Sequence, residues 1–279
     1  MASTALRALT FFALSEVSWA NLYKFGVFSD IHLLLDYQPN LSPEQYCVPN
    51  SSGSDIVLPT NAYFGRFGCD VPETLVRAAM QKMLNENPDL DFLLIPGDFI
   101  GHGLTIDFKD DADITFKASQ ARYERLKNTQ VHVTALLNEY FPNVPVVMSL
   151  GNNDAKYHYQ PPFGLNEQGY YHLLFEEWFS QHPGNQGLNL AEIKSTTAQG
   201  GWYRAELIPG ELTVLCFNSL QFNKKNQEVS VEEKQDQLAW LEAQLSQAGP
   251  SEKFFLLMHI YATAGWWLQP YLNWIQDQY

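Results

Sequence analysis

The sequence has few basic residues. Its 17 Lys and Arg stand against 31 Asp and Glu, which gives a formal net charge of −14. No run of Lys or Arg occurs that could follow a nucleic-acid backbone. A nucleic-acid partner is therefore not expected.

Long apolar segments are also missing. No stretch reaches the ~18 apolar residues that a membrane-spanning helix needs, so we expect no transmembrane span. The first twenty residues carry a shorter pattern, in which Arg7 precedes an apolar run and the small residues Ser18 and Ala20 follow it. This pattern predicts a signal peptide over residues 1–20, with a buried N-terminal helix as the alternative. We expect residues 21–279 to be secreted or to enter a lysosomal or vacuolar lumen.

Cysteine is scarce, with three residues in the chain. Cys47 and Cys69 flank a polar loop, and Cys216 lies in an apolar run. For an exported protein this predicts a Cys47–Cys69 disulfide and a buried, free Cys216. Asn40 and Asn50 each begin an N-x-S sequon near or in the same loop, so we expect glycosylation at both.

Short apolar runs rich in β-forming residues alternate with longer helical patterns, which predicts a layered α/β fold. Asp70 is expected to cap a helix that runs to about Asn85, and Ser230 with Glu233 forms a capping box for another. Further helices are expected over 118–140 and 167–179. The predicted strands are 23–29, 92–95, 144–150, 201–207, 212–218 and 254–258.

Polar residues follow four of these strands. Asp30 and His32 end the first on one side of an extended backbone, Asp98 follows Gly97 after the second, and Asn152 and His259 follow two later strands. Strand ends are where α/β proteins usually keep their chemistry. Each motif alone is weak, since D-x-H also occurs as a hydrogen-bonded pair and Asn is a common turn residue. The ordered set favours a functional site.

The series resembles the signature of the calcineurin-like metallophosphoesterases, which is D-x-H, G-D, G-N-H-D/E, a lone His after a strand, and G-H-x-H. Asp30 and His32 match its first element, Asp98 the second, Asn152 the third and His259 the fourth. The chain is most similar to the acid-sphingomyelinase-like phosphodiesterases, on a cysteine-bearing loop after D-x-H, on residues 66–72 and on a His four residues after the G-D aspartate. The resemblance implies an α/β/β/α sandwich.

It also implies two divalent metal ions that share Asp98, one held with Asp30 and His32 and the other with Asn152 and His259. Zinc is favoured by the imidazole ligands, and manganese or iron would also suit the carboxylates. The composition offers few side-chain cations that could attract a phosphate, and such ions would supply that positive charge.

Catalysis of ester hydrolysis also needs a proton donor for the leaving alkoxide, and His102 is our candidate. The alternative is an exposed loop histidine between two glycines.

The sequence departs from the family pattern at two places. Asn153 replaces the histidine of G-N-H, so we expect it to bind phosphate by hydrogen bonding rather than to transfer a proton. His158 is a further candidate for substrate contact. The G-N-N-D form also resembles the endopolyphosphatases, which makes polyphosphate a rival substrate.

The second departure is that no G-H-x-H occurs before Tyr279. We expect the missing ligands and the rest of the sandwich to lie beyond this chain. The aromatic segment 266–275 is expected to form core or the wall of the substrate cleft.

Taken together, the residues and the resemblance predict a secreted, dinuclear phosphodiesterase that acts on a small phosphodiester or a phospholipid. An endopolyphosphatase and a catalytically inactive glycoprotein with the same fold are the alternatives.

Overall fold

The computed structural model of the chain describes a large part of the sequence. The expected signal peptide over residues 1–20 and the glycosylation candidate Asn50 lie outside the described residues. Only the backbone is described for 116–120 and 168. The described residues are 22–41, 46–47, 62–105, 116–160, 168–226 and 229–277.

Two three-stranded sheets form the centre of the fold. The first is parallel and has the order β1 (Phe25–Val27), β2 (Phe92–Ile95) and β3 (Val146–Met148). All residues of β2 and β3 are buried, as expected for parallel strands covered on both faces. The second sheet has the order β4 (Tyr203–Ile208), β5 (Leu212–Cys216) and β6 (Lys253–Leu257), in which β4 and β5 are antiparallel and β5 and β6 are parallel.

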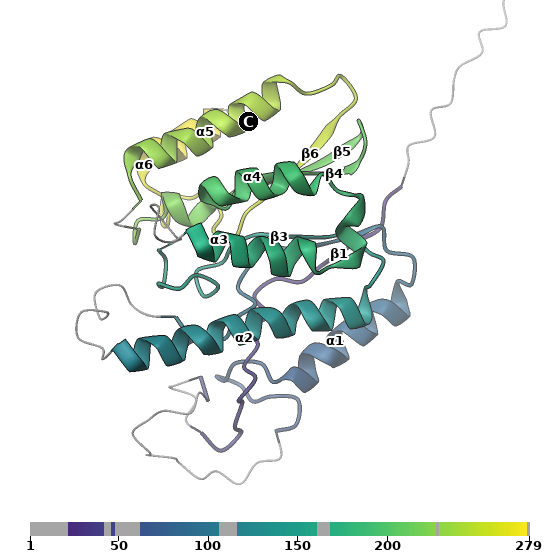
Figure 1. Cartoon of the computed structure of the whole chain (residues 1–279), viewed down its shortest axis with the longest axis vertical. Helices are drawn as coiled ribbons and strands as arrows, with labels where there is room; N and C mark the ends of the chain where they lie inside the picture. The colour runs from purple at the N-terminus through teal and green to yellow at the C-terminus, as the bar shows by residue number, and fades with distance from the viewer. Residues whose placement is uncertain are drawn as a thin grey trace, which may run out of the picture.

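Helices cover these sheets at both ends of the molecule (Figure 1). Helices α1 (Glu73–Glu86) and α2 (Phe116–Tyr140) lie at one end, and α5 (Val231–Ser246) and α6 (Gln269–Asp277) lie at the other. The mixed α/β architecture confirms the expected fold class. None of the helices in the described ranges has the length and apolar character needed to cross a bilayer.

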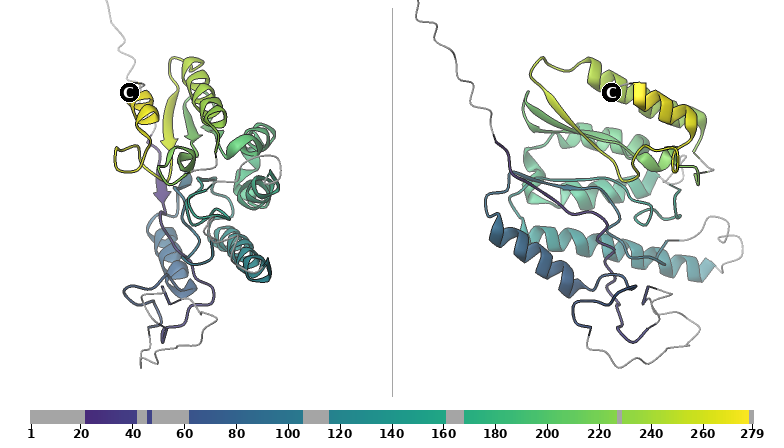
Figure 2. Two further views of the ribbon diagram at one scale, coloured as in Figure 1. Left: turned by 90° about the vertical axis from the view of Figure 1, so that its left-hand side faces the viewer. Right: turned by 180° about the vertical axis from the view of Figure 1, so that it is seen from behind.

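Two further helices pack side by side between these ends (Figure 2). Helix α3 (Gln168–Phe175) continues into a π-helical turn over Glu176–Ser180, and its neighbour α4 (Leu190–Gly200) packs on β4. Two short 3₁₀ turns, Pro183–Gly187 and Ser219–Phe222, complete the connections.

The two sheets meet through β3. The backbone N–H of Met148 donates to the Tyr203 hydroxyl at 3.0 Å, and that hydroxyl donates to the Met148 carbonyl. The Cys216 thiol donates to the same carbonyl, with 3.4 Å between sulfur and oxygen. Cys216 is buried and free, which confirms the prediction for it. One hydrophobic cluster therefore runs through both sheets and fixes the strand ends of one relative to the other.

Several predicted element ends were correct and others were wrong. Strand β2 has the predicted bounds, and the Ser230–Glu233 capping box at α5 is present. The prediction that Asp70 caps α1 was wrong. Pro72 occupies the N-cap position without a side-chain cap, because the Asp70 carboxylate binds His102 instead.

The segment around the disulfide lies beside the loops that follow β1. Cys47 and Cys69 are joined as expected, with their Cα atoms 5.2 Å apart. Arg66 donates to the carbonyls of Pro39 and Leu41 at 2.8 and 3.2 Å, which ties the two sides of this segment together. Asn40, the other glycosylation candidate, lies half-buried in a turn between them.

Candidate active site

Four chain segments meet at the carboxyl ends of β1, β2, β3 and β6. Asp30 follows β1, Asp98 follows β2, Asn152 follows β3 and His259 follows β6. The backbone after β1 stays paired to that after β2, since the N–H of Asp30 donates to the Gly97 carbonyl at 3.2 Å and that of His32 to the Asp98 carbonyl at 3.0 Å. The topology thus gathers residues that are 229 positions apart in the chain, from Asp30 to His259.

Two glycines allow the loops after β2 and β3 to touch. Gly97 has φ +100°, and a Cβ atom there would lie 2.6 Å from the Gly151 nitrogen. A Cβ atom at Gly151 would lie 2.1 Å from Asp98 Oδ1. Both separations are far below van der Waals contact, so the close backbone approach expected at Gly97 is present and depends on both glycines.

Three of the predicted ligands have left-handed backbone conformations. Asp30, His32 and Asp98 have φ values of 53°, 49° and 55°. Such conformations cost non-glycine residues about 1 kcal/mol or more each, and they concentrate at functional sites. The sequence predicted an extended strand through Asp30 and His32, which was wrong because β1 ends at Val27. The backbone turns after it, and the carboxylate and imidazole still lie near one another.

Asp98 is the centre of the cluster. Its carboxylate oxygen Oδ2 lies 3.7 Å from His32 Nε2 and 3.5 Å from His259 Nε2, and His32 Nε2 lies 3.9 Å from Asp30 Oδ1. Asn152 Oδ1 lies 3.1 Å from His259 Nε2. The side chain of Asp98 is 4% exposed, whereas that of Asp30 is 56% exposed and opens the cluster to solvent.

The two imidazoles are oriented by backbone carbonyls. His32 Nδ1 lies 3.2 Å from the Ile100 carbonyl, and His259 Nδ1 lies 3.0 Å from the Pro96 carbonyl. A carbonyl can only accept, so Nδ1 carries a proton in both rings, and Nε2 is the ring atom that faces Asp98 and can bind a metal when it carries no proton. A backbone carbonyl of this kind commonly fixes the orientation of a metal-ligating histidine.

The donor set fits divalent metal ions. Asn152 Oδ1 and Asp98 Oδ2 lie 3.1 and 3.5 Å from His259 Nε2, so three atoms that can each bind a metal lie close together. Two atoms that bind one ion at about 2.1 Å each lie roughly 3–4 Å apart. The separations around Asp98 fall in this range. Asp30, Asp98 and His259 can thus bring ligand atoms to one ion, and His32 and Asn152 lie beside them.

The pKa values of the cluster reflect its burial and its negative charge. Burial acts to raise the pKa of Asp98, but attraction to His259 and hydrogen bonds from Asn153 outweigh it and hold this pKa below its usual value. Burial acts to lower the pKa of His259, and Asp98 overcomes that effect and raises it. For His32 burial is the larger effect, so its pKa is lowered despite the neighbouring carboxylates. His32 is therefore neutral and ready to donate its lone pair to a metal.

Asp154 was not predicted to have a role. Its carboxylate fixes the backbone of the loop that carries Asp98. Its carboxylate accepts the backbone N–H groups of Asp98, Phe99, Ile100 and Gly151 at 2.7, 2.9, 3.2 and 2.8 Å. Burial, and next the charge of Asp98, raise the pKa of Asp154 to about 7. The G-N-N-D motif contained this residue, and its position two residues after the predicted ligand Asn152 was the available signal.

His102 lies beside the cluster with its ring held on three sides. Its Nδ1 lies 2.8 Å from Asp70 Oδ1, and its backbone N–H donates to Asp70 Oδ2 at 2.5 Å. The ring stacks on His32 with centroids 4.3 Å apart, and on Tyr46 at 4.1 Å. Tyr46 was not predicted to have a role, and Asp70 was predicted to have the wrong one. Asp70 lies in the segment Cys69–Pro72, which carried part of the family resemblance. That position was the sequence signal for a role of Asp70 at the site.

The two candidates for substrate contact lie in different places. Asn153 is 2% exposed, and its backbone N–H and its Nδ2 donate to the two carboxylate oxygens of Asp98 at 2.9 and 2.8 Å. The structure therefore places Asn153 against Asp98, away from the opening of the site. His158 is half-buried, and its Nε2 lies 3.0 Å from Asn152 Nδ2, so it contacts a predicted ligand directly.

A pocket of about 300 Å³ opens beside the cluster. Its lining contains the predicted ligands Asp30, Asn152 and His259. Its other lining residues are Tyr159, Ile260, Tyr261 and Trp266. The aromatic segment 266–275 thus supplies both cleft wall and core, as expected, since Trp266 lines the pocket while Trp267 is fully buried. Most of this segment lies in α6.

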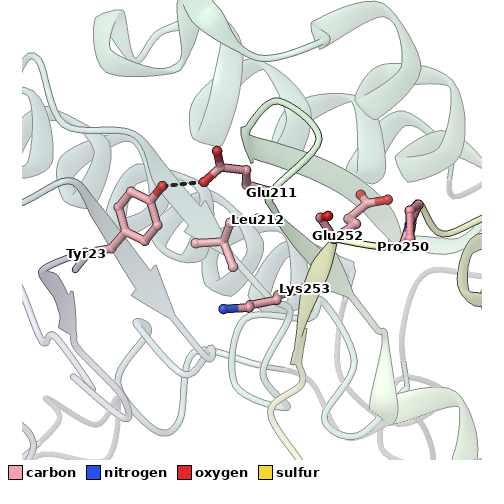
Figure 3. Close-up of a pocket in the computed structure, with 7 residues that line it drawn as sticks. Tyr23, Glu211, Leu212, Pro250, Glu252 and Lys253 are labelled. Atoms are coloured by element: carbon pink, nitrogen blue, oxygen red, sulfur yellow. Dashed lines mark hydrogen bonds between the residues drawn. The ribbon is translucent and has the colours of Figure 1, made fainter. Parts of the chain in front are cut away.

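A larger pocket, of about 530 Å³, lies at the opposite ends of the strands. Tyr23, which precedes β1, donates to Glu211 Oε2 at 2.8 Å across its edge, and Lys253 begins β6 beside it (Figure 3). None of the predicted metal ligands lines this pocket. We therefore place the chemistry at the smaller pocket.

Comparison with known proteins agrees with this geometry. The family model described as calcineurin-like phosphoesterase matches residues 23–276. Sphingomyelinase phosphodiesterase D of Dictyostelium discoideum is 29% identical over 209 residues, which cover 73% of this chain and 41% of that protein. Acid sphingomyelinase-like phosphodiesterase 3b of Mus musculus is 28% identical over 262 residues, which cover 92% and 52%.

A relative that is named for a different activity also matches. The endopolyphosphatase of Schizosaccharomyces pombe is 25% identical over 267 residues, which cover 88% of this chain and 42% of that protein. The chain therefore spans about half the length of the curated relatives that it matches.

Proposed function

Because the chain belongs to the calcineurin-like phosphoesterase family, we propose that it is a metal-dependent hydrolase of phosphodiesters whose site is centred on Asp98. The observation that carries the proposal is the cluster in which His32 and His259 lie beside the Asp98 carboxylate, with Asp30 next to His32 and Asn152 next to His259. Carboxylate, amide and imidazole groups clustered beside a pocket suit a phosphate held through divalent cations.

In this proposal Asp98 would contribute to the binding of two ions. Asp30 and His32 would help to hold one of them, and Asn152 and His259 would help to hold the other. When bound, the ions would neutralise the charge of the phosphate and lower the pKa of the attacking water toward neutrality. Zinc is our first choice, with manganese or iron as alternatives, because the set mixes imidazole with carboxylate ligands.

His102 is proposed to give a proton to the leaving oxygen. Asp70 binds Nδ1 of its ring, so Nε2 is the atom that can carry this proton. Stacking on His32 and Tyr46 fixes the plane of the ring. Asp70 is then a positioning residue, which acts on the reaction through His102.

Asn153 is proposed to orient the shared carboxylate. Its two hydrogen bonds to Asp98 fix the rotation of the carboxyl group, and they support an ionised Asp98. His158 is proposed to position Asn152 through the contact between their side chains.

Export of the protein is part of the proposal. The Cys47–Cys69 disulfide is the observation that supports an oxidising compartment, in which signal-peptide removal and glycosylation at Asn40 and Asn50 would also occur. The destination is outside the cell or a lysosomal or vacuolar lumen.

The test is turnover by the purified, metal-loaded full chain. We expect hydrolysis of bis(p-nitrophenyl) phosphate that is lost with a chelator and restored by Zn²⁺ or Mn²⁺. Absence of turnover from a folded chain with two bound ions would favour the inactive glycoprotein.

Endopolyphosphatase activity is the second candidate, favoured by the Asn152–Asn153 pair and by the similarity to the endopolyphosphatase. Gel analysis of long-chain polyphosphate before and after incubation separates the two, because only an endopolyphosphatase shortens the chains from within.

A further inference from the structure

The disulfide lies next to two residues that contact His102. Tyr46 directly precedes Cys47, and Asp70 directly follows Cys69. The Tyr46 ring stacks on the His102 ring with 4.1 Å between the centroids and 9° between the planes. Asp70 binds the ring nitrogen Nδ1 and the backbone N–H of His102. One covalent bond therefore joins the two chain segments that hold the same imidazole.

The segment that carries Asp70 is also fixed without the disulfide. The N–H of Val71 donates to the His32 carbonyl at 3.0 Å, and the N–H of Leu34 donates to the Val71 carbonyl at 2.9 Å. Asp70 is 5% exposed, and a Cβ atom at Gly101 would lie 2.9 Å from its Oδ2. Backbone pairing with the loop after β1 and close packing thus hold Asp70 in place.

The segment that carries Tyr46 depends more on the disulfide. Tyr46 and Cys47 have φ values of 55° and 61°, so two consecutive residues with side chains adopt the disfavoured left-handed conformation. Tyr46 is 43% exposed, so burial of its side chain contributes little to its position. Its carbonyl accepts the N–H of Asp70 at 3.1 Å. The covalent bond one residue later is the stronger of these two connections to the Asp70 segment.

The direction of the free nitrogen of His102 depends on Tyr46 as well as on Asp70. The His102 ring lies between two nearly parallel rings, since it also stacks on His32 with centroids 4.3 Å apart and 14° between the planes. The hydrogen bond to Asp70 fixes one ring atom, Nδ1, whereas the stacked rings fix the plane. Both constraints are needed to fix where Nε2 points.

We propose that the Cys47–Cys69 disulfide is required for proton transfer by His102, because it holds Tyr46 against the imidazole and so fixes the direction of Nε2. The proposal rests on the proposed phosphoesterase function and adds a control of it. Tyr46 is then a positioning residue, which acts on the reaction through His102. A chain that has two thiols at these positions should bind metals and hydrolyse esters with good leaving groups, but should protonate poor leaving groups inefficiently.

The proposal makes activity depend on the redox state of the compartment. When the bond forms by exchange with a small disulfide, the two cysteine thiols lose two electrons and two protons, and the small disulfide is left as two thiols. This reaction is favoured in oxidising compartments. The acid step is therefore switched on where the bond forms, and a chain kept reduced lacks it.

The first test is turnover of two methyl phosphodiesters by the metal-loaded full chain, one with p-nitrophenol and one with phenol as leaving group. We expect Tyr46→Leu to lower kcat for the phenol ester about tenfold and that for the p-nitrophenol ester by less than about twofold, because only the poorer leaving group needs the proton. Tyr46→Phe keeps the stacked ring and should behave as wild type. An unchanged ratio of the two rates in Tyr46→Leu would overturn the proposal.

Tyr63→Leu is the matched control, because it makes the same change on the same side of the disulfide loop as Cys69. Tyr63 is 68% exposed, and its ring contacts that of Phe64. This variant should leave both rates and their ratio unchanged. Equal effects of Tyr63→Leu and Tyr46→Leu would reduce the result to a general loosening of the segment and contradict the specific role of Tyr46.

The second test asks whether the disulfide acts through Tyr46. Alanine at both Cys47 and Cys69 removes the bond without placing a hydroxyl at the buried Cys47 position. We expect this variant to show the rate ratio of Tyr46→Leu, and to lose little more when the two changes are combined, because they remove the same constraint. Metal content should stay at the wild-type level. Independent losses that multiply would show that the disulfide does not act through Tyr46.

The third test needs no turnover. In the metal-free chain with ¹³C-labelled histidine, the signal that His102→Ala removes belongs to the His102 ring, and Tyr46→Leu gives its position without the Tyr46 ring current. Reduction of the native chain by a dithiol should move this signal toward that position and leave those of His172 and His182 in place. An unmoved His102 signal would overturn the proposal, and a shift of all histidine signals together would show a purely structural role and overturn it too.

The outcomes separate this proposal from the proposed function. A selective shift of the His102 signal on reduction, in a chain that hydrolyses no phosphodiester, would sink the phosphoesterase and keep the link from the disulfide to His102. Metal-dependent hydrolysis with no change in the His102 signal on reduction would keep the phosphoesterase and sink the role of the disulfide.

Discussion

Asp70 binds His102 through both of its carboxylate oxygens: Oδ1 lies 2.8 Å from Nδ1 of the ring and Oδ2 accepts the backbone N–H at 2.5 Å. A carboxylate that accepts at Nδ1 sets the tautomer of the ring, and the second bond fixes the loop that carries it. Asp70 is 5% exposed, so solvent competes little for these bonds. The aspartate thus fixes the ring and the loop of His102 while lying outside the Asp98 cluster, which is the arrangement that the proposed acid role of His102 requires.

Asp70→Asn should therefore slow turnover while sparing metal binding. An asparagine can present its amide nitrogen to Nδ1 and so select the wrong tautomer, and we expect kcat to fall by roughly tenfold to a hundredfold. The measurement is kcat for bis(p-nitrophenyl) phosphate together with the metal content of the purified variant. Loss of metal in step with activity would contradict the positioning role.

His102→Ala should slow the hydrolysis of esters with poor leaving groups most. A general acid contributes about a hundredfold or more only where the leaving oxygen needs a proton, so alkyl esters should lose far more rate than p-nitrophenyl esters. The check is a comparison of kcat/KM across leaving groups of graded pKa. An equal loss for every substrate, with metal content unchanged, would remove the acid role from His102.

The sequence predicted local features well and those set by distant contacts poorly. β2 has its predicted bounds because its four residues are all apolar and β-forming, and the Ser230 capping box was read from residues three apart. Asp70 was predicted to cap a helix because it lies where a cap residue would in the sequence. Its contact with His102 depends on the fold and could not be seen in the sequence. The helix α6 was not predicted, although its buried residues Leu272 and Ile275 recur at helical spacing, because the aromatic residues and Pro270 drew attention to core or cleft wall.

The five predicted metal ligands illustrate the same limit. Their order along the chain pointed to a shared site, and the structure brings all five into one cluster. The left-handed backbone at Asp30, His32 and Asp98 could not be predicted, because local propensity opposes it. Contacts such as that of Asp154 with the Asp98 loop stabilise this backbone conformation. They join residues more than fifty positions apart.

Asp154→Asn should destabilise the fold. The carboxylate accepts four backbone N–H groups, whereas an amide offers one acceptor oxygen and turns an N–H donor toward the remaining donors. We expect a loss of roughly 3 kcal/mol in the free energy of unfolding, which lowers Tm by about 6–12 °C. Calorimetry in the presence of a chelator measures it without a contribution from metals. Asp236→Asn, at an exposed position of α5, is the control and should change Tm little.

Cys216 should be unreactive in the native protein. It is fully buried, and burial raises the pKa of its thiol to about 12, while Cys47 and Cys69 are paired. Titration with a thiol reagent should find no reactive thiol in the native chain and one in denaturant without reductant. Three thiols in denaturant without reductant would show that the disulfide does not form.

The central claim is that one carboxylate, Asp98, is shared by two metal ions. Calorimetric titration of Zn²⁺ into the metal-free chain tests it, with Asp98→Ala compared with wild type and with Asp89→Ala, which removes a surface carboxylate paired with Lys24. We expect two binding events in wild type and in Asp89→Ala, and loss of both in Asp98→Ala. Two ions bound to Asp98→Ala with wild-type affinity would contradict the account.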